Sequence, residues 1–154
     1  MVCLVRINPF QKVCCIFNIV YLQSVNLENI KGYLSGLFDS DGSIYLNRSS
    51  GQVFITISQK TRFLLDLIYS IYGGTVYYNM AQHTAFKWTV YRKIDVLNLI
   101  NNYFIVNNCI SAKQKRILLA KEFYELNKIG ALKASKNTDL NLKLISFIEK
   151  WEFK

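Results

Sequence analysis

Two carboxylates stand one residue apart at the end of an apolar stretch that reads L-S-G-L-F-D-S-D-G from Leu34 to Gly42. Asp39 and Asp41 fall where a helix is expected to end, and Gly42 permits a sharp exit of the chain. Carboxylate oxygens are ligands that Mg²⁺ and Ca²⁺ prefer in proteins. If two such helix ends met, their carboxylates would gather at one point. The pattern therefore indicates a divalent-metal site.

Small residues follow the spacing of a helix through the same region. Gly32 and Gly36 are four residues apart, and Ser40 follows four residues later. Residues at this spacing share one helix face, and small side chains there let a second helix backbone approach closely. A tight helix pair is the arrangement that would bring two carboxylate ends together.

Two other interpretations of the acidic motif compete with a metal site. Asp-Ser-Asp-Gly is also ordinary turn chemistry that needs no function. A calcium-binding EF-hand loop contains a similar run, but with Gly42 as its glycine the first ligand position falls on Leu37 and the twelfth on Arg48. Neither side chain can bind Ca²⁺ in those positions, which excludes the EF-hand.

Three segments carry a resemblance to a known family. Residues Tyr33 to Ile44 (Y-L-S-G-L-F-D-S-D-G-S-I) resemble the signature of the LAGLIDADG homing endonucleases. Ile57 to Thr61 (I-S-Q-K-T) resembles the end of that family's second strand, and Ser111 to Arg116 (S-A-K-Q-K-R) resembles its basic segment at the start of a late helix. The segments occur in the family's order at compatible spacings, and the resemblance covers about residues 28–128.

The resemblance implies a metal-dependent hydrolysis of phosphodiesters in double-stranded DNA. Asp41 matches the family's metal-binding carboxylate, with the Ser40 carbonyl as a second ligand and Mg²⁺ as the expected ion. Gln59 matches a residue that orients the water network. Lys113 matches a basic residue near the scissile phosphate, where it polarises water or stabilises charge.

The chain contains one such motif, and one Asp41 cannot supply a paired site. A twofold homodimer of Leu34 helices is the economical solution, and it implies a roughly palindromic target with one half-site per subunit. The residues expected at this interface are Gly32, Ser35, Gly36 and Asp39, and for Asp39 the alternative role is to hold the end of the helix. The alternative is that the chain is half of a two-motif enzyme.

A second functional hypothesis is a non-catalytic nucleic-acid binder, such as a maturase that helps its intron RNA fold and splice. A binder has no need of Asp41, yet Asp41, Gln59 and Lys113 are all present. This combination favours the nuclease. A decayed, inactive gene product is a third interpretation.

The elements that must position these residues alternate between helix and strand. Apolar periodicity predicts a helix over 27–40 with Asn26 as its N-cap, and a hairpin of strands 44–48 and 52–58. The remaining predicted elements are a helix over 61–72, a hairpin of strands 75–80 and 85–91, and helices over 94–103, 111–126 and 140–151, with Ser111 as an N-cap. This order predicts an α+β protein, αββαββα plus C-terminal helices, as the resemblance also implies. We expect one domain over 28–154, preceded by an extension over 1–27.

One face of the predicted antiparallel sheet is apolar, and the other is polar, aromatic and mildly basic. Such a face is either an ordinary solvent-facing surface or a surface suited to base edges in the major groove. With the family resemblance we favour DNA contact. The residues expected to contact DNA are Tyr45, Asn47, Arg48, Ser49, Gln52, Phe54, Thr56, Arg62, Thr75, Tyr77, Asn79, Lys87, Thr89, Tyr91 and Lys115.

Charge supports a polyanionic partner. The 154 residues include 19 Lys and Arg against 10 acidic residues, a net charge of +9. This excess favours nucleic acid first and a membrane surface second. Lys113 and Lys115 stand at the start of a predicted helix, where positive charge is unfavourable unless phosphate neutralises it.

The rest of the composition bears on compartment. Four cysteines without a C-x-x-C pair and a single histidine make a zinc site an unfavoured interpretation and indicate reduced, intracellular thiols. Abundant Ile, Asn, Lys, Tyr and Phe indicate an AT-rich genome such as that of a mitochondrion or chloroplast. The apolar stretch 13–22 is too short to span a bilayer. A leader or read-through segment, a packed element and a membrane anchor are the interpretations left for residues 1–27, and we expect no stable membrane association.

Overall fold

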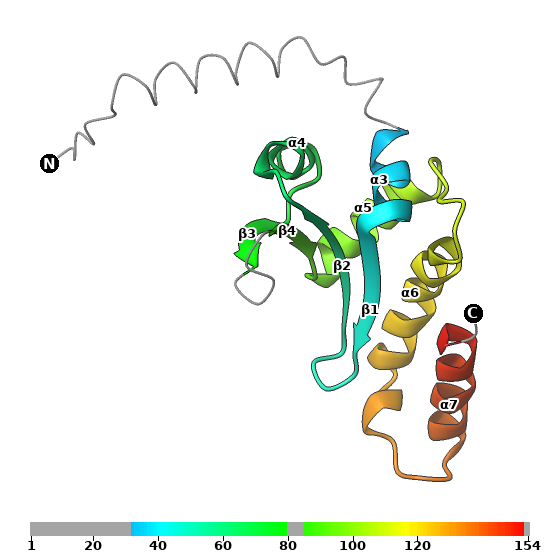
Figure 1. Ribbon diagram of the computed structural model, residues 1–154. Helices are drawn as coiled ribbons and strands as arrows, with labels where there is room; N and C mark the ends of the chain where they lie inside the picture. Colours follow the sequence, from blue (N-terminus) through cyan, green and yellow to red (C-terminus); the bar gives the residue numbers. More distant parts are fainter. Residues whose placement is uncertain (1–31, 80–84, 153–154) are drawn as a thin grey trace, which may run out of the picture.

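The computed structural model describes residues 32–79 and 85–152 (Figure 1). The apolar stretch 13–22, the proposed cap Asn26 and the extension 1–27 lie outside the described residues. The elements are α3 (Tyr33–Asp41), β1 (Gly42–Asn47), β2 (Gln52–Gln59), α4 (Arg62–Tyr72), β3 (Thr75–Asn79), β4 (Ala85–Val90), α5 (Lys93–Leu99), a π-helix η2 (Ile100–Phe104), α6 (Lys113–Lys128), a 3₁₀ helix η3 (Ala131–Lys133) and α7 (Asp139–Glu152). The predicted α+β order is confirmed.

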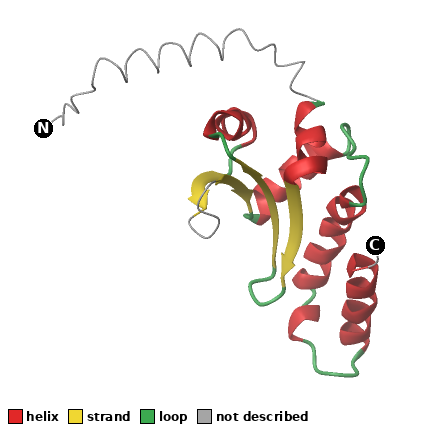
Figure 2. Ribbon diagram, viewed as in Figure 1, coloured by secondary structure: helices red, strands yellow, loops and turns green. Residues whose placement is uncertain are grey.

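The four strands form one antiparallel sheet in the order β1-β2-β4-β3. Helices α3, α4, α5 and α6 all contact the sheet, while α7 packs outside α6 and η3 (Figures 1 and 2). The sheet therefore has a covered face and an open face. Within the described part of the chain, no helix is both long and apolar enough to cross a membrane.

Alternation along the strands determines which face is covered. Val53, Ile55 and Ile57 on β2 and Trp88 and Val90 on β4 are all buried. They join helix residues, including Phe38 of α3 and Ile117 of α6, in one hydrophobic core. Side chains two residues apart in a strand share a face, so the intervening residues point to the open face. The predicted division of the sheet into two faces is confirmed.

Two of the helix predictions need correction. The helix expected over 94–103 is α5 followed by the π-helix η2, in which Tyr103 and Phe104 are buried. The helix expected from Ser111 begins at Lys113 instead. Ser111 still serves the helix start, because its hydroxyl accepts a hydrogen bond of 3.3 Å from the Lys113 amide.

Candidate active site

Asp41 and Gln59 meet where α3 enters the sheet. Asp41 is the exposed last residue of α3, and Gln59 ends β2. The antiparallel register pairs Gly42 with Ile57, which places the two side chains near one another. The Gln59 side-chain amide donates a hydrogen bond of 2.6 Å to the Asp41 carboxylate. Two of the three predicted catalytic residues are thus in direct contact.

Gly42 has a role different from the one expected. Its backbone is extended with a φ of −82°, so it does not form the left-handed exit of a helix. An added Cβ would lie 2.5 Å from the Phe38 carbonyl oxygen and closer still to the Phe38 ring. Glycine is needed because the chain must pass tightly over Phe38 as it leaves the helix.

Lys113 reaches the same helix end from α6. Its Nζ donates hydrogen bonds of 2.9 Å to the Phe38 carbonyl and 2.7 Å to the Asp39 carbonyl, and it lies 5.7 Å from the centre of the Phe38 ring. The last carbonyls of a helix lack partners of their own and form the negative end of its dipole. Within one subunit, the α3 carbonyls therefore compensate the positive charge of Lys113 at the start of α6. Phosphate was the partner expected for this charge.

Asp39 is bound within its own subunit. Its carboxylate accepts hydrogen bonds from the Ile110 amide (2.7 Å), the Ser111 amide (3.1 Å) and the Ser111 hydroxyl. Burial alone would raise the pKa of Asp39, but these three bonds and the nearby Lys113 lower it below its usual value. Asp39 therefore holds the end of α3, one of the two roles expected for it, by tying α3 to the loop that leads into α6; a role at the subunit interface stays a prediction.

The small-residue face of α3 is only partly as expected. Gly32 and Gly36 are exposed, and a Cβ added to either would meet nothing within 4 Å. Ser35 is buried at 8% exposure, its hydroxyl donates to the Gly32 carbonyl, and its amide donates to the Tyr103 hydroxyl at 2.9 Å. Ser35 faces the core and is removed from the interface prediction. Tyr103 lies 68 residues away, so no local sequence signal could have identified it.

The donors at the end of α3 fit a divalent cation of the oxygen-preferring kind. The Asp41 carboxylate is exposed and accepts one hydrogen bond, from Gln59. The Ser40 hydroxyl donates to the Leu37 carbonyl at 3.0 Å, and its backbone carbonyl is the second ligand that the family resemblance implies. Within residues 32–79 and 85–152, no group of three or more His, Cys, Asp or Glu side chains gathers into a metal site. A Mg²⁺ ion that keeps several waters needs only a few such protein donors.

The open face of the sheet carries its side chains in transverse rows. Register pairs Tyr45 with Phe54 across β1 and β2, and Tyr91, the residue after β4, continues the row beside Phe54. The next row toward α3 consists of hydroxyl residues, of which Thr56 and Thr89 are only 2% and 5% exposed. These two threonines are therefore removed from the expected DNA contacts. Of the other face residues that were predicted to contact DNA, Thr75 and Tyr77 are exposed, and the partly exposed ones are Asn47, Gln52, Asn79 and Lys87.

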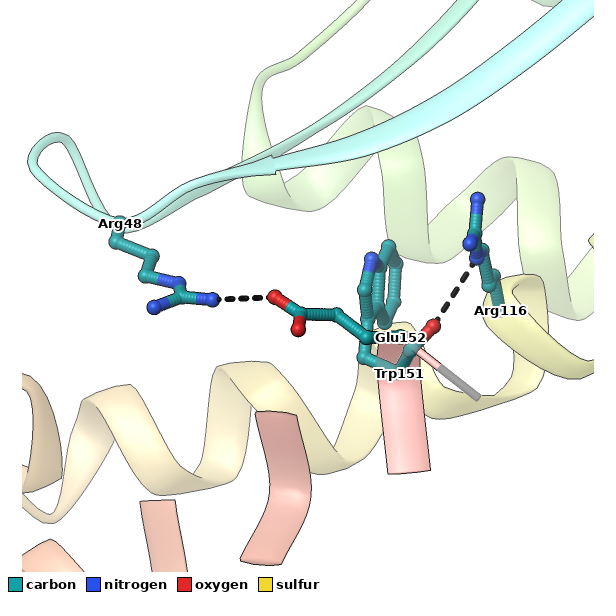
Figure 3. Close-up of polar contacts among 4 residues, drawn as sticks. All are labelled: Arg48, Arg116, Trp151 and Glu152. Atoms are coloured by element: carbon teal, nitrogen blue, oxygen red, sulfur yellow. Dashed lines mark hydrogen bonds and ion pairs between the residues drawn. The ribbon is translucent and has the colours of Figure 1, made fainter. Parts of the chain in front are cut away.

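Arg48 and Arg62, which were predicted to contact DNA, already have partners in the chain, as does the neighbouring Arg116. Arg48, in the β1–β2 turn, pairs with Glu152 of α7 at 2.8 Å (Figure 3). Arg116 of α6 donates to the adjoining Trp151 carbonyl at 3.1 Å, which holds the end of α7 in place (Figure 3). Arg62 pairs with Asp66 at 3.1 Å. These ion pairs are exposed and hence weak, so a DNA phosphate can replace the carboxylate.

The two remaining predicted DNA contacts, Ser49 and Lys115, lie in the β1–β2 turn and on α6. The Ser49 hydroxyl donates to the Asn47 side-chain oxygen at 2.7 Å, which closes the β1–β2 turn. Lys115 is exposed in the first turn of α6.

Of the four cysteines, Cys109 is buried as a free thiol, and burial raises its pKa to about 12. The other three and the single histidine lie outside the described residues.

The comparison with protein families settles what this architecture is. A model of the LAGLIDADG endonuclease family matches residues 34–124, more than half of the chain. The chain belongs to the LAGLIDADG endonuclease family. The segment that carries Asp41, Gln59 and Lys113 lies entirely within this LAGLIDADG match.

Curated relatives of this LAGLIDADG chain are intron-encoded proteins of two kinds. The RNA maturase bI4 of Saccharomyces cerevisiae is 32% identical over 151 residues, covering 95% of this chain and 24% of that protein. The probable endonuclease aI2 of Debaryomyces hansenii is 28% identical and covers 97% of this chain and 25% of that protein. The DNA endonuclease ai2b of Dictyostelium discoideum is 32% identical, with coverages of 81% and 50%. The chain thus spans between a quarter and a half of these relatives' length.

Solved LAGLIDADG structures share the fold. The archaeal intron-encoded homing endonuclease I-Vdi141I, complexed with DNA, aligns with a TM-score of 0.55 and 22% identity over 82% of this chain and 99% of that chain. I-LtrWI bound to target DNA aligns with a TM-score of 0.61 and 21% identity over 81% of this chain and 44% of that chain. The predicted fold class is confirmed.

Proposed function

We propose that this LAGLIDADG chain is a metal-dependent, site-specific DNA endonuclease that makes a double-strand break in a long, nearly palindromic site. The observation that carries the proposal is the hydrogen bond of 2.6 Å between Gln59 and Asp41, at the same helix end that Lys113 binds. Family membership and the DNA complexes of structurally similar proteins support it.

Each residue has a defined task in this proposal. Asp41 and the Ser40 carbonyl would hold Mg²⁺, which would supply stabilisation of the negative charge that develops on the phosphate. Gln59 fixes the orientation of the Asp41 carboxylate, and its side-chain carbonyl can hold a water beside it. Lys113 uses two of its three N–H donors on α3 carbonyls. The third donor can bind a phosphate oxygen.

The second catalytic site comes, in this proposal, from a second copy of the chain. Exposed Gly32 and Gly36 leave the surface of α3 open to a helix from the partner. Pairing of the two α3 helices would place both Asp41 side chains near the twofold axis. The alternative is a homologous half supplied by a longer protein, which would give the same geometry with an asymmetric target. The match to I-LtrWI supports this alternative, because this chain aligns with only 44% of that chain.

The test is selection and cleavage from a randomised DNA library by the purified full-length chain. We expect one long, nearly palindromic site, cut with Mg²⁺ and uncut with EDTA. Asp41→Asn should abolish cleavage, at least a thousandfold as an order of magnitude for loss of a metal ligand at the reacting centre, and leave binding measured with Ca²⁺ largely intact. Comparable loss of binding and cleavage would mean that Asp41 is structural. A site with two unlike halves would point to a missing partner half.

A second candidate function is an intron RNA maturase. The observation that favours it is the 32% identity to the maturase bI4 across 95% of this chain. Binding of the folded chain to its own intron RNA, in the absence of any DNA cleavage, would support this function over the nuclease. An organelle location, expected from codon bias, remains part of the proposal, and intron-encoded relatives support it.

A further inference from the structure

Three aromatic rings form a continuous stack across the open face of the sheet. The Tyr45 and Phe54 rings lie 5.0 Å apart between centroids with planes 2° from parallel, and Phe54 and Tyr91 lie 5.5 Å apart at 18°. Strand register makes this a single transverse row, here called the aromatic row. Tyr45 and Tyr91 are 41% and 40% exposed. An apolar band therefore lies on the surface proposed to enter a DNA groove.

Few side chains around the aromatic row can form the hydrogen bonds that recognise guanine. Among the described strand residues of the open face, Lys87 alone carries a formal charge, and none is arginine. Gln52 supplies an amide on the side away from α3. The Asn47 oxygen is occupied by Ser49 and by the Ser50 amide. In the major groove, apolar groups contact the thymine methyl, Gln pairs with adenine, and Arg or Lys pairs with guanine.

We propose that the aromatic row reads thymine C5-methyl groups, so that this chain selects A·T base pairs at the positions beneath the row. The inference rests on the proposed DNA-binding function of the sheet. Ring orientation supports methyl contact over stacking on unpaired bases. Phe54 lies between the two tyrosines, so both of its faces are covered and its edge alone is available, whereas an unpaired base needs a free ring face; in the row only the outer faces of Tyr45 and Tyr91 are not covered by a neighbouring ring.

The structure also gives the position of these base pairs along a half-site. Tyr45 follows Asp41 by four residues along β1, and strands advance about 3.4 Å per residue. The aromatic row therefore lies about 13 Å from the catalytic end of α3, a distance that corresponds to about four base pairs of B-DNA. Figure 1 shows the β1–β2 hairpin running from α3 toward its turn. The A·T pairs are expected about three to five base pairs outward from the cleaved phosphates.

The experiment measures binding of full-length chain to duplexes selected from a randomised library, with Ca²⁺ in place of Mg²⁺. Thymines are replaced one at a time by deoxyuridine, which lacks only the methyl group. Burial of one methyl group corresponds to about a fourfold change in affinity. We expect about this loss for thymines under the aromatic row and no loss for thymines elsewhere. Because the protein is unchanged, misfolding cannot produce the result.

A variant then links the effect to the row. Phe54→Ser should weaken DNA binding, and replacing thymine by deoxyuridine should then cause no further loss of affinity. The control is Tyr69→Ser, which removes a 50% exposed aromatic from α4; in this variant the deoxyuridine replacements should still lower the affinity. G·C pairs at the row positions, or deoxyuridine effects that persist in Phe54→Ser, would overturn the inference while leaving the endonuclease proposal standing. Stronger dependence of single-stranded RNA binding than duplex binding on Phe54 would overturn it in favour of base stacking. Failure to enrich any DNA would overturn the proposed function itself.

Discussion

The three hydrogen bonds to Asp39 should make Asp39→Ala destabilising far beyond an ordinary surface substitution. A net hydrogen bond to a charged group contributes about 1.5–3 kcal/mol when buried. Asp39 is half-exposed, and water can replace part of each bond, so we expect a total loss of about 2–3 kcal/mol. For a chain of this size, each kcal/mol lowers Tm by about 2–4 °C. The expected fall is about 4–12 °C.

Thermal and urea unfolding at pH 7 measure this loss. Asp66→Ala is the matched control, since it removes a carboxylate from an exposed i,i+4 ion pair on α4 and should cost no more than about 0.5 kcal/mol. A double-mutant cycle with Ser111→Ala should show coupling of about 1 kcal/mol, because the two residues share a hydrogen bond. Equal stability losses in Asp39→Ala and the control would refute the reasoning.

The pH dependence of stability gives an independent check on Asp39. Its pKa in the folded chain is lowered from 3.8. The ionised carboxylate therefore stabilises the fold above the unfolded pKa, and this contribution is lost as pH falls through the lower, folded pKa. The stability difference between the natural chain and Asp39→Ala should be constant from neutral pH down to about pH 5. It should shrink below about pH 4, and a difference that grew toward acid would contradict the direction of the shift.

Three further substitutions test other parts of the structure. Gly42→Ala should cost about 1–3 kcal/mol in urea unfolding because the new Cβ collides with Phe38, and an unchanged unfolding midpoint would mean that the turn relaxes freely. Gly36→Leu should leave the subunit at least as stable, since the site is open and leucine favours helix by about 1 kcal/mol; it should nevertheless abolish dimers in sedimentation, and persistent dimers would remove α3 from the interface. Glu152→Gln should free Arg48, change stability by less than about 0.5 kcal/mol and steepen the salt dependence of DNA binding by about one counterion. Glu149→Gln removes the same charge from an exposed position with no ion pair in the described chain, so an equal effect there would exclude a specific role for Arg48.

Local periodicity was sufficient to predict the strands and their two faces, whereas Asp41 and Gln59 were joined in one site only by the family resemblance, and the hairpin register shows why they meet. Each of these follows from patterns within one hairpin or one motif. The contacts that the sequence did not indicate join distant segments. Asp39 binds Ile110 and Ser111, which lie 71 and 72 positions further along the chain. Arg48 pairs with Glu152, which lies 104 positions further along. No short-range pattern marks such pairs, because the folded chain alone brings them together.

Burial on the open face was the other source of error. Thr56 and Thr89 alternate correctly with the core residues, so sequence placed them on the accessible side. Their neighbours in the structure include larger side chains, and the Thr89 hydroxyl donates to the Tyr77 hydroxyl at 3.4 Å. Alternation predicts the direction of a side chain but not the height of the groups beside it. The accessible surface was therefore narrower than the sequence indicated.

The dependence of α3 on distant partners has a consequence for the order of events during synthesis. The amide of Ser35 is satisfied by Tyr103, and the carbonyls at the other end of the helix are satisfied by Lys113, 75 residues after Phe38. At about 5–20 residues per second, a ribosome needs about 4–15 s to add those residues. Until they emerge, both ends of the helix lack their partners. If subunits pair through α3 as proposed, the pairing helix is finished only after Lys113 has emerged from the ribosome, so pairing would follow the synthesis of α6's first turn and not that of α3 itself.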